Sequence, residues 1–181
     1  MSERAAASRL LEAALMPVGA AALVFAVCMG LLGFGLYLQH GLGLEPCPMC
    51  IVQRYALVLI AACSAFAGLT SKRLAQQLAL AASGLLAGFG AFVAARQSWL
   101  QWFPPESYSC GRDFYGMIET FPLKRAIPMI FRGSGDCTKI DWTFLGLSIA
   151  NWSFLAFVAL GLLCVALLLR MRHQPPKQSG L

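Results

Sequence analysis

Residues 142–169 read WTFLGLSIANWSFLAFVALGLLCVALLL, a stretch of 28 positions without one charged side chain. An α-helix needs about 20 apolar residues to cross the hydrocarbon core of a bilayer. Three further uncharged stretches precede it, at residues 13–44, 55–71 and 74–95. The sequence therefore predicts an all-α membrane protein, a four-helix transmembrane bundle.

The composition of the whole chain agrees with this class. Of its 181 residues, 59% are hydrophobic and 12% are charged, whereas about a quarter of the residues of a soluble domain are charged. A soluble enzyme is therefore excluded. The net charge of +6 does not indicate nucleic-acid binding, because the basic residues form no long run with interleaved aromatic residues and many flank the apolar stretches.

We expect a single membrane domain, residues 1–181, in a monomer. Its transmembrane spans are expected at about residues 14–38, 51–70, 74–95 and 145–169. Two loops, at about 39–50 and 96–144, join these spans on one side of the membrane. Within the second loop, residues 114–131 mix apolar and basic side chains, which suits either a short element on the membrane surface or a loop folded onto the bundle.

The distribution of Lys and Arg predicts the orientation in the membrane. These residues are denser in segments 1–12, 70–73 and 170–181 than in the two loops on the opposite side. The positive-inside rule then places both termini in the cytoplasm and the two loops in the periplasm of a bacterial inner membrane.

Glycines at helical spacing occur in the first and third spans: Gly30, Gly33, Gly35, Gly84, Gly88 and Gly90. Small residues let membrane helices approach each other closely. Both sets are therefore predicted to lie at contacts between helices.

The seven cysteines fall into two groups. Three lie inside apolar stretches, where a thiol packs as a small apolar group: Cys28, Cys63 and Cys164. The other four lie in the loops expected outside, where disulfides form and persist: Cys47, Cys50, Cys110 and Cys137. Of their three possible pairings, the one that keeps each disulfide within its own loop joins Cys47 to Cys50 and Cys110 to Cys137.

Cys47-Pro48-Met49-Cys50 is a Cys-x-x-Cys motif at the head of an expected helix, which proline at the first helical position favours. A helix N-terminus stabilises a thiolate, and so small a ring contributes little to folding, so the motif indicates redox chemistry. The alternative is a zinc site completed by Cys110, Cys137 or His40.

A disulfide between Cys110 and Cys137 has two interpretations. It would close a ring worth about 3 kcal/mol of stability, which is a structural role. Cys137, however, follows the small and polar residues Gly133-Ser-Gly-Asp, which leave its sulfur open to thiol–disulfide exchange. The spacing alone does not choose between them.

Arg54 is the charged residue placed most unusually. It follows Cys50 by four residues, with Gln53 beside it, so Cys50 and Arg54 share one helix face at the start of an apolar stretch. A charge there is either functional or extends toward the lipid headgroups. In the functional case, the guanidinium stabilises negative charge on the Cys50 sulfur or on a bound electron acceptor. A lipid-soluble quinone fits by elimination, because the chain has no nucleotide-binding loop, haem motif or iron–sulfur ligand set.

Several segments together resemble the disulfide bond formation protein B (DsbB) family, the quinone-dependent thiol oxidases of the bacterial inner membrane. They are residues 45–54 (EPCPMCIVQR), 109–111 (SCG), 135–137 (GDC) and 141–148 (DWTFLGLS). The resemblance extends over essentially the whole chain. It implies a four-helix bundle, a periplasmic DsbA-like partner of thioredoxin fold, and ubiquinone or menaquinone as acceptor.

The resemblance also implies roles for individual residues. Reduced partner would attack the Cys110–Cys137 disulfide and be held through Cys110, and Cys137 would then exchange with Cys47. Cys50 would be released as a thiolate facing the quinone, which Arg54 supports. Some relatives carry histidine at the position of Gln97, near the quinone.

Other classes of membrane protein fit the sequence less well. A vitamin K epoxide reductase-like enzyme would carry its Cys-x-x-Cys motif near the last span, which here contains only Cys164. A zinc-binding structural protein would hold metal and exchange no thiols. A proton- or cation-coupled transporter is disfavoured, because the four uncharged stretches contain no acidic residue.

Overall fold

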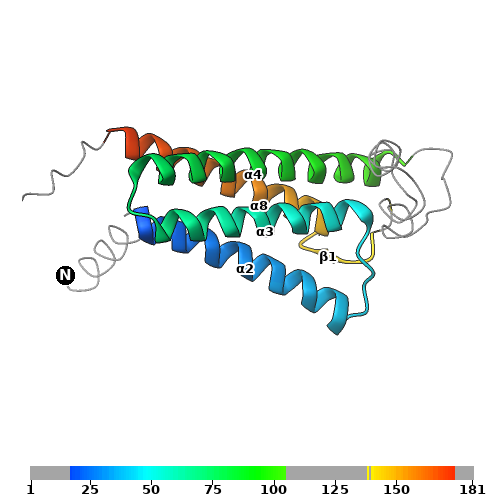
Figure 1. Ribbon diagram of the computed structural model, residues 1–181. Helices are drawn as coiled ribbons and strands as arrows, with labels where there is room; N and C mark the ends of the chain where they lie inside the picture. The colour runs from blue at the N-terminus through cyan, green and yellow to red at the C-terminus, as the bar shows by residue number, and fades with distance from the viewer. Residues whose placement is uncertain (1–16, 105–137, 139, 174–181) are drawn as a thin grey trace, which may run out of the picture.

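The computed structural model describes residues 17–104, 138 and 140–173. Within these residues the chain forms four long helices side by side (Figure 1): α2 (Pro17–Gly41), α3 (Pro48–Leu69), α4 (Arg73–Trp102) and α8 (Ile149–His173). All four are long and apolar enough to cross a membrane. The predicted four-helix membrane bundle is confirmed.

A short antiparallel hairpin precedes α8. Its strands are β1 (Thr143–Phe144) and β2 (Leu147–Ser148). Leu145 and Gly146 form the turn with positive φ angles of 51° and 77°, as two-residue hairpin turns require. The hairpin straddles the end of the expected loop 96–144 and the start of the expected span 145–169, neither of which was predicted to contain a strand, and α8 begins only at Ile149.

Helix α4 is longer than the apolar stretch that predicts it. It continues beyond residue 95 to Trp102, so the first residues of the expected loop 96–144 are helical. Arg96 ends the apolar stretch but not the helix, because arginine is a good helix former. The extra turns carry Gln97 and Gln101 to the end of the bundle where α3 begins.

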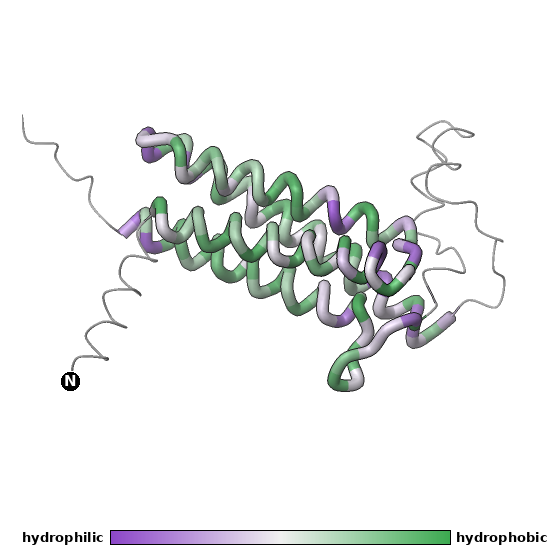
Figure 2. The backbone as a smooth tube through the Cα atoms, turned by 90° about the horizontal axis from the view of Figure 1, so that it is seen from below, coloured by the Kyte–Doolittle hydropathy of each residue, from purple (hydrophilic) through white to green (hydrophobic). Residues whose placement is uncertain are grey.

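The packing of the four helices is uneven. Helix α4 packs extensively against both α3 and α8, and α2 packs against α3, whereas α2 and α8 touch sparsely. In Figure 1, α2 slants away from α3 toward Gly41. Figure 2 shows hydrophobic residues along the middle of the helices, with hydrophilic residues gathered toward the ends.

The small residues of the bundle have different surroundings. A Cβ atom on Gly84 would lie 3.6 Å from the Cβ of Cys164, and one on Gly90 would overlap the Phe157 ring, so both glycines lie at helix contacts as predicted. The prediction is wrong for three others, because no described atom lies within 4 Å of a Cβ placed there: Gly30, Gly33 and Gly88.

Candidate functional site

The first turn of α3 brings the Cys-x-x-Cys sulfurs together. Cys47 is the N-cap residue, and its sulfur accepts a hydrogen bond from the backbone N–H of Cys50 at 3.3 Å. Pro48 opens the helix, as the sequence predicts. The two sulfur atoms lie 2.7 Å apart, compared with about 2.05 Å in a disulfide. The pair can therefore close into a disulfide with little movement of the helix.

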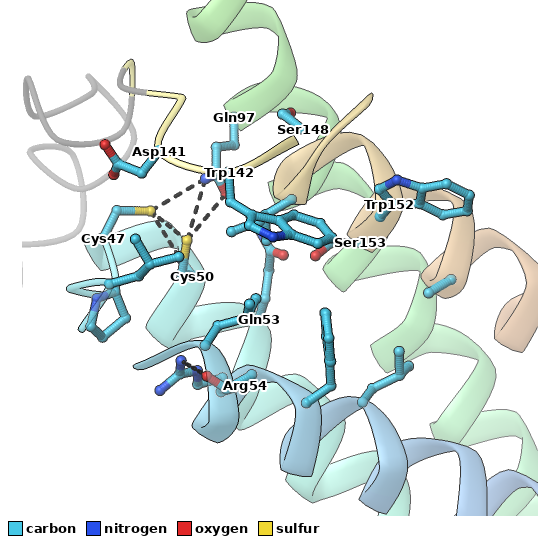
Figure 3. Close-up of a pocket in the computed structure, with 18 of the residues that line it drawn as sticks. Cys47, Cys50, Gln53, Arg54, Gln97, Asp141, Trp142, Ser148, Trp152 and Ser153 are labelled. Carbon is cyan, nitrogen blue, oxygen red and sulfur yellow. Dashed lines mark hydrogen bonds between the residues drawn. The ribbon is translucent and has the colours of Figure 1, made fainter. Parts of the chain in front are cut away.

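A glutamine from α4 reaches both sulfurs. The Nε2 atom of Gln97 lies 3.3 Å from the sulfur of Cys47 and 3.3 Å from the sulfur of Cys50. Figure 3 shows the Gln97 side chain pointing from α4 to the two sulfurs. Only 4% of Gln97 is exposed, so its contact with Cys47 is buried, and its contact with Cys50 is partly buried.

A second buried glutamine fixes the first. Gln53, on α3, donates from Nε2 to the Oε1 atom of Gln97 at 2.8 Å, and it is 5% exposed. The amide oxygen of Gln97 thus accepts from Gln53 and also lies 3.8 Å from the Cys50 sulfur, which can donate to it as a thiol, whereas the amide nitrogen lies closer to both sulfurs. The two side chains connect α3 to α4 at the level of the cysteine pair.

Arg54 lies at the same pocket as Cys50 but donates to a different helix. Its Nη1 and Nη2 atoms donate to the Oε1 atom of Gln39 at 2.5 Å and to the carbonyl oxygen of Gly35 at 2.9 Å. Both acceptors belong to α2. A Cβ atom at Gly35 would lie 3.6 Å from the Arg54 Nε atom, so this glycine makes room for the guanidinium, while the other α2 glycines named above face open space.

Between these groups lies a pocket of about 530 Å³, within the usual size range of small-ligand sites. Its walls are mostly apolar, and Cys47, Cys50, Gln97 and Arg54 supply polar groups. The pocket therefore suits a mainly apolar ligand with a polar edge. The acidic side chains Glu45 and Asp141 also line it, and both are exposed.

Aromatic rings form a connected row along the pocket: Phe34, Trp142, Phe144 and Trp152. Phe34 meets Trp142 edge-on at 5.8 Å between ring centroids, and Trp142 stacks on Phe144 at 6.0 Å. Phe144 lies 6.0 Å from Trp152. These rings form one wall of the pocket, which runs from α2 along the hairpin to α8.

Hydrogen bonds hold the hairpin against the bundle. The Ser148 hydroxyl donates to the Oε1 atom of Gln101 at 2.6 Å and accepts from the backbone N–H of Asn151 at 3.5 Å. The Trp152 indole donates to the carbonyl oxygen of Phe144 at 3.0 Å. Ser148 thus ties the start of α8 to α4 beside the pocket.

Three of the five residues singled out in the sequence lie at this pocket: Cys47, Cys50 and Arg54. Cys110, Cys137 and the segment 114–131 lie outside the described residues. Among the described residues, no three His, Cys, Asp or Glu side chains gather as metal ligands would. The contacts of Gln97 with the cysteine pair, of Gln53 with Gln97 and of Gln39 with Arg54 were not predicted. The signals for them were polar side chains near apolar stretches and, for Gln97, the resemblance that places its position near the quinone.

Comparison with known proteins shows the family of this chain. The sequence model of the family described as "Disulfide bond formation protein DsbB" matches residues 18–167. A protein named Disulfide bond formation protein B from Polaromonas sp. (strain JS666 / ATCC BAA-500) is 68% identical over 162 residues, covering 88% of this chain and 95% of the relative.

Two further relatives carry the same name. That of Polaromonas naphthalenivorans (strain CJ2) is 65% identical, with 84% of this chain and 92% of the relative covered. That of Paracidovorax citrulli (strain AAC00-1) is 64% identical, with 82% and 85% covered. With matches along nearly its whole length, the chain belongs to the DsbB family of disulfide bond formation proteins.

Proposed function

We propose that the protein is a thiol:quinone oxidoreductase that reoxidises a DsbA-like partner in the periplasm of a bacterial inner membrane. One observation carries this proposal: a single apolar pocket is lined by both sulfurs of the Cys47–Cys50 pair and by Arg54. Family membership supports the disulfide chemistry. The vitamin K epoxide reductase-like alternative lacks this support.

The pocket residues fit a quinone. A quinone has a flat, mostly apolar ring with two carbonyl oxygens at its edge, and the pocket joins aromatic and aliphatic walls to a few donors. Arg54, held by Gln39 and Gly35, would donate to an oxygen of the ring, and the aromatic row would hold its faces. A bound quinone supplies a sink for two electrons and two protons.

The electrons come from the partner by two thiol–disulfide exchanges. The two thiols of the reduced partner become a disulfide as Cys110–Cys137 is reduced to two thiols. Cys110 and Cys137 then become a disulfide again as Cys47–Cys50 is reduced. Each exchange forms one S–S bond and breaks one, so two electrons arrive at the Cys47–Cys50 pair. With both termini in the cytoplasm, all four sulfurs face the periplasm.

The proposal is tested with full-length protein in detergent, a reduced thioredoxin-fold dithiol partner and a soluble short-chain quinone. We expect quinone absorbance to fall only when the reduced partner is present, and Cys50→Ala to reduce this rate at least about a thousandfold, because no second route to the acceptor exists. The matched control is Cys63→Ala, which removes a sulfur from the same helix away from this pocket and should keep the wild-type rate.

The orientation has its own test. A membrane-impermeant maleimide added to intact spheroplasts should label reduced Cys47 and Cys50. Labelling only after the membrane is opened would reject the periplasmic location.

In the turnover experiment, quinone reduction by Cys50→Ala at the wild-type rate would reject the pair as the electron donor.

A further inference from the structure

We propose that Gln97 is a catalytic residue that stabilises the thiolate of the Cys47–Cys50 pair by donating hydrogen bonds to the sulfurs, and that Gln53 is the positioning residue that sets the direction of donation. The role rests on the proposed function, in which this pair carries the electrons. The geometry that points to it is the contact of one amide nitrogen with both sulfurs.

The Nε2 atom of an amide carries two N–H groups. At 3.3 Å from each sulfur, it can direct one N–H to Cys47 and the other to Cys50. A thiolate in an apolar, water-poor site needs such donors, because an anion without hydrogen bonds is costly to bury. Gln97 is 4% exposed, so its contribution is not diluted by competing water.

The direction of the Gln97 amide is decisive, because its other end would repel a thiolate. In the observed orientation Oε1 lies 3.8 Å from the Cys50 sulfur alone, and with the amide reversed it would take the place of Nε2, 3.3 Å from both sulfurs, as an acceptor. The hydrogen bond from Gln53 Nε2 to Gln97 Oε1, 2.8 Å long, favours the orientation in which the nitrogen faces them. Gln53 itself is 5% exposed and is held within α3.

Arg54 is arranged for a different task. Its hydrogen bonds to Gln39 and Gly35 direct the guanidinium toward α2, across the pocket from α4. The neutral amide of Gln97 therefore contacts the two sulfurs, whereas the guanidinium of Arg54 lies on the α2 side of the pocket. Of the two roles that the sequence allows for Arg54, at the Cys50 sulfur or at the acceptor, this arrangement favours the acceptor.

The test measures thiolate formation directly. Reduced full-length protein is alkylated with iodoacetamide from pH 5 to 10, and the modification of Cys47 and Cys50 is followed by peptide mass spectrometry. Gln97→Met keeps the length of the side chain but removes both N–H groups. We expect the midpoint of its alkylation-rate profile to rise by about one pH unit, which is about a tenfold loss of thiolate at pH 7.

Quinone reduction should follow the same pattern. The Gln97→Met rate should be about tenfold below wild type at pH 7 and should approach it near pH 9, because raising the pH restores the thiolate. A loss due only to disturbed packing would persist at both pH values. The other charged side chains at this pocket are Glu45, Arg54 and Asp141, and all three are unchanged in the variant.

Two further variants complete the test. Gln53→Met, which frees the Gln97 amide to turn, should raise the midpoint in the same direction by a smaller amount, about threefold in thiolate. It also keeps the proposal testable if Gln97→Met does not fold. The matched control is Gln76→Met, which removes a hydrogen bond to the Thr70 carbonyl at the other end of α4 and should leave the midpoint unchanged.

The outcomes distinguish the two proposals. If wild-type protein reduces quinone and the midpoints of Gln97→Met and Gln53→Met equal that of wild type, the role of Gln97 is overturned and the proposed function stands. If wild-type protein reduces no quinone, the proposed function fails whatever the alkylation profiles show.

Discussion

The two ends of the helix bundle are packed in different ways. Away from the pocket, small residues let the helices meet: a Cβ atom on Gly68 would lie 3.6 Å from the Cβ of Ala21, and one on Gly161 would lie 3.7 Å from that of Ala87. At the pocket end, glutamine, arginine and aromatic side chains fill the space between the helices and surround a cavity of about 530 Å³.

The boundary between the two ends shows how one bundle can combine tight helix packing with a cavity. Phe157 is buried against Gly90 on α4, and its ring also lines the pocket. The ring fits there because position 90 has no side chain. The size of the side chain at position 90 therefore sets where the tight packing stops and the cavity begins. The polar groups at the pocket end supply the hydrogen-bonding and redox groups of the cavity.

Among the variants that test this comparison, the largest effect is expected from removing the positive charge of Arg54 at the pocket end. Arg54→Met should lower kcat/KM for quinone about a hundredfold, because a preoriented cationic donor in a water-poor site is lost. The effect should appear in quinone-dependent turnover, while exchange between the partner and the cysteine pair is kept. Arg170→Met, at the opposite end of α8 where the side chain is exposed, is the control. Equal quinone kinetics in the two variants would remove Arg54 from the site.

The boundary itself can be broken at Gly90. Gly90→Ala should destabilise the protein by about 1–3 kcal/mol, because the new Cβ overlaps the buried Phe157 ring. Thermal unfolding in detergent measures this loss, and a raised quinone KM would show that the ring has moved into the pocket. Gly88→Ala on the same helix meets nothing within 4 Å among the described residues and should be neutral or stabilising by up to about 1 kcal/mol. Equal unfolding midpoints would contradict the assigned boundary.

A smaller effect should sharpen the role of α2. Gln39→Met removes one of the two acceptors that hold Arg54, at a cost of about 1 kcal/mol. We expect the KM for quinone to rise about fivefold with little change in kcat, since the guanidinium stays in the pocket but is less well oriented. Leu36→Met, at an exposed position on α2, provides the comparison. A fall in kcat alone, without change in KM, would argue against this positioning role.

The smallest effect concerns the hairpin wall. Trp152→Phe keeps an aromatic ring beside Phe144 but removes the indole hydrogen bond to its carbonyl oxygen. The bond is exposed, so we expect a loss of only about 0.5 kcal/mol in unfolding free energy. Chemical unfolding in mixed detergent can measure it. A loss as large as that of Gly90→Ala would mean that the hairpin contributes to the core of the bundle.

The sequence predicted the parts of the fold that depend on local patterns. Uncharged stretches predicted the four helices, and Pro48 together with the cysteine spacing predicted the helix start at Cys47. The interval of four residues placed Cys50 and Arg54 at one pocket. Each of these conclusions needs only the geometry of a single helix.

The contacts between helices were not predictable in the same way. Gln97 and Cys50 are 47 positions apart, and their contact depends on the register of α4 against α3 and on the extension of α4 beyond Arg96. Gly35 lies at a contact between helices, as predicted, but its neighbour there is the Arg54 side chain of α3, which the sequence did not indicate. The direction of a flexible arginine or glutamine is set by its acceptors, and those lie on other helices.

The sparse contact between α2 and α8 has a consequence for how an acceptor is supplied. Side chains of both helices line the pocket, among them Leu31 and Leu155, so the pocket lies where these two helices are not packed tightly together. For an acceptor that partitions into the bilayer, the quantity that saturates the enzyme is its mole fraction among the lipids. Adding detergent at constant total quinone then lowers the mole fraction of quinone in the detergent and lipid phase. Values of KM for quinone can therefore be compared only at equal mole fractions of quinone in that phase.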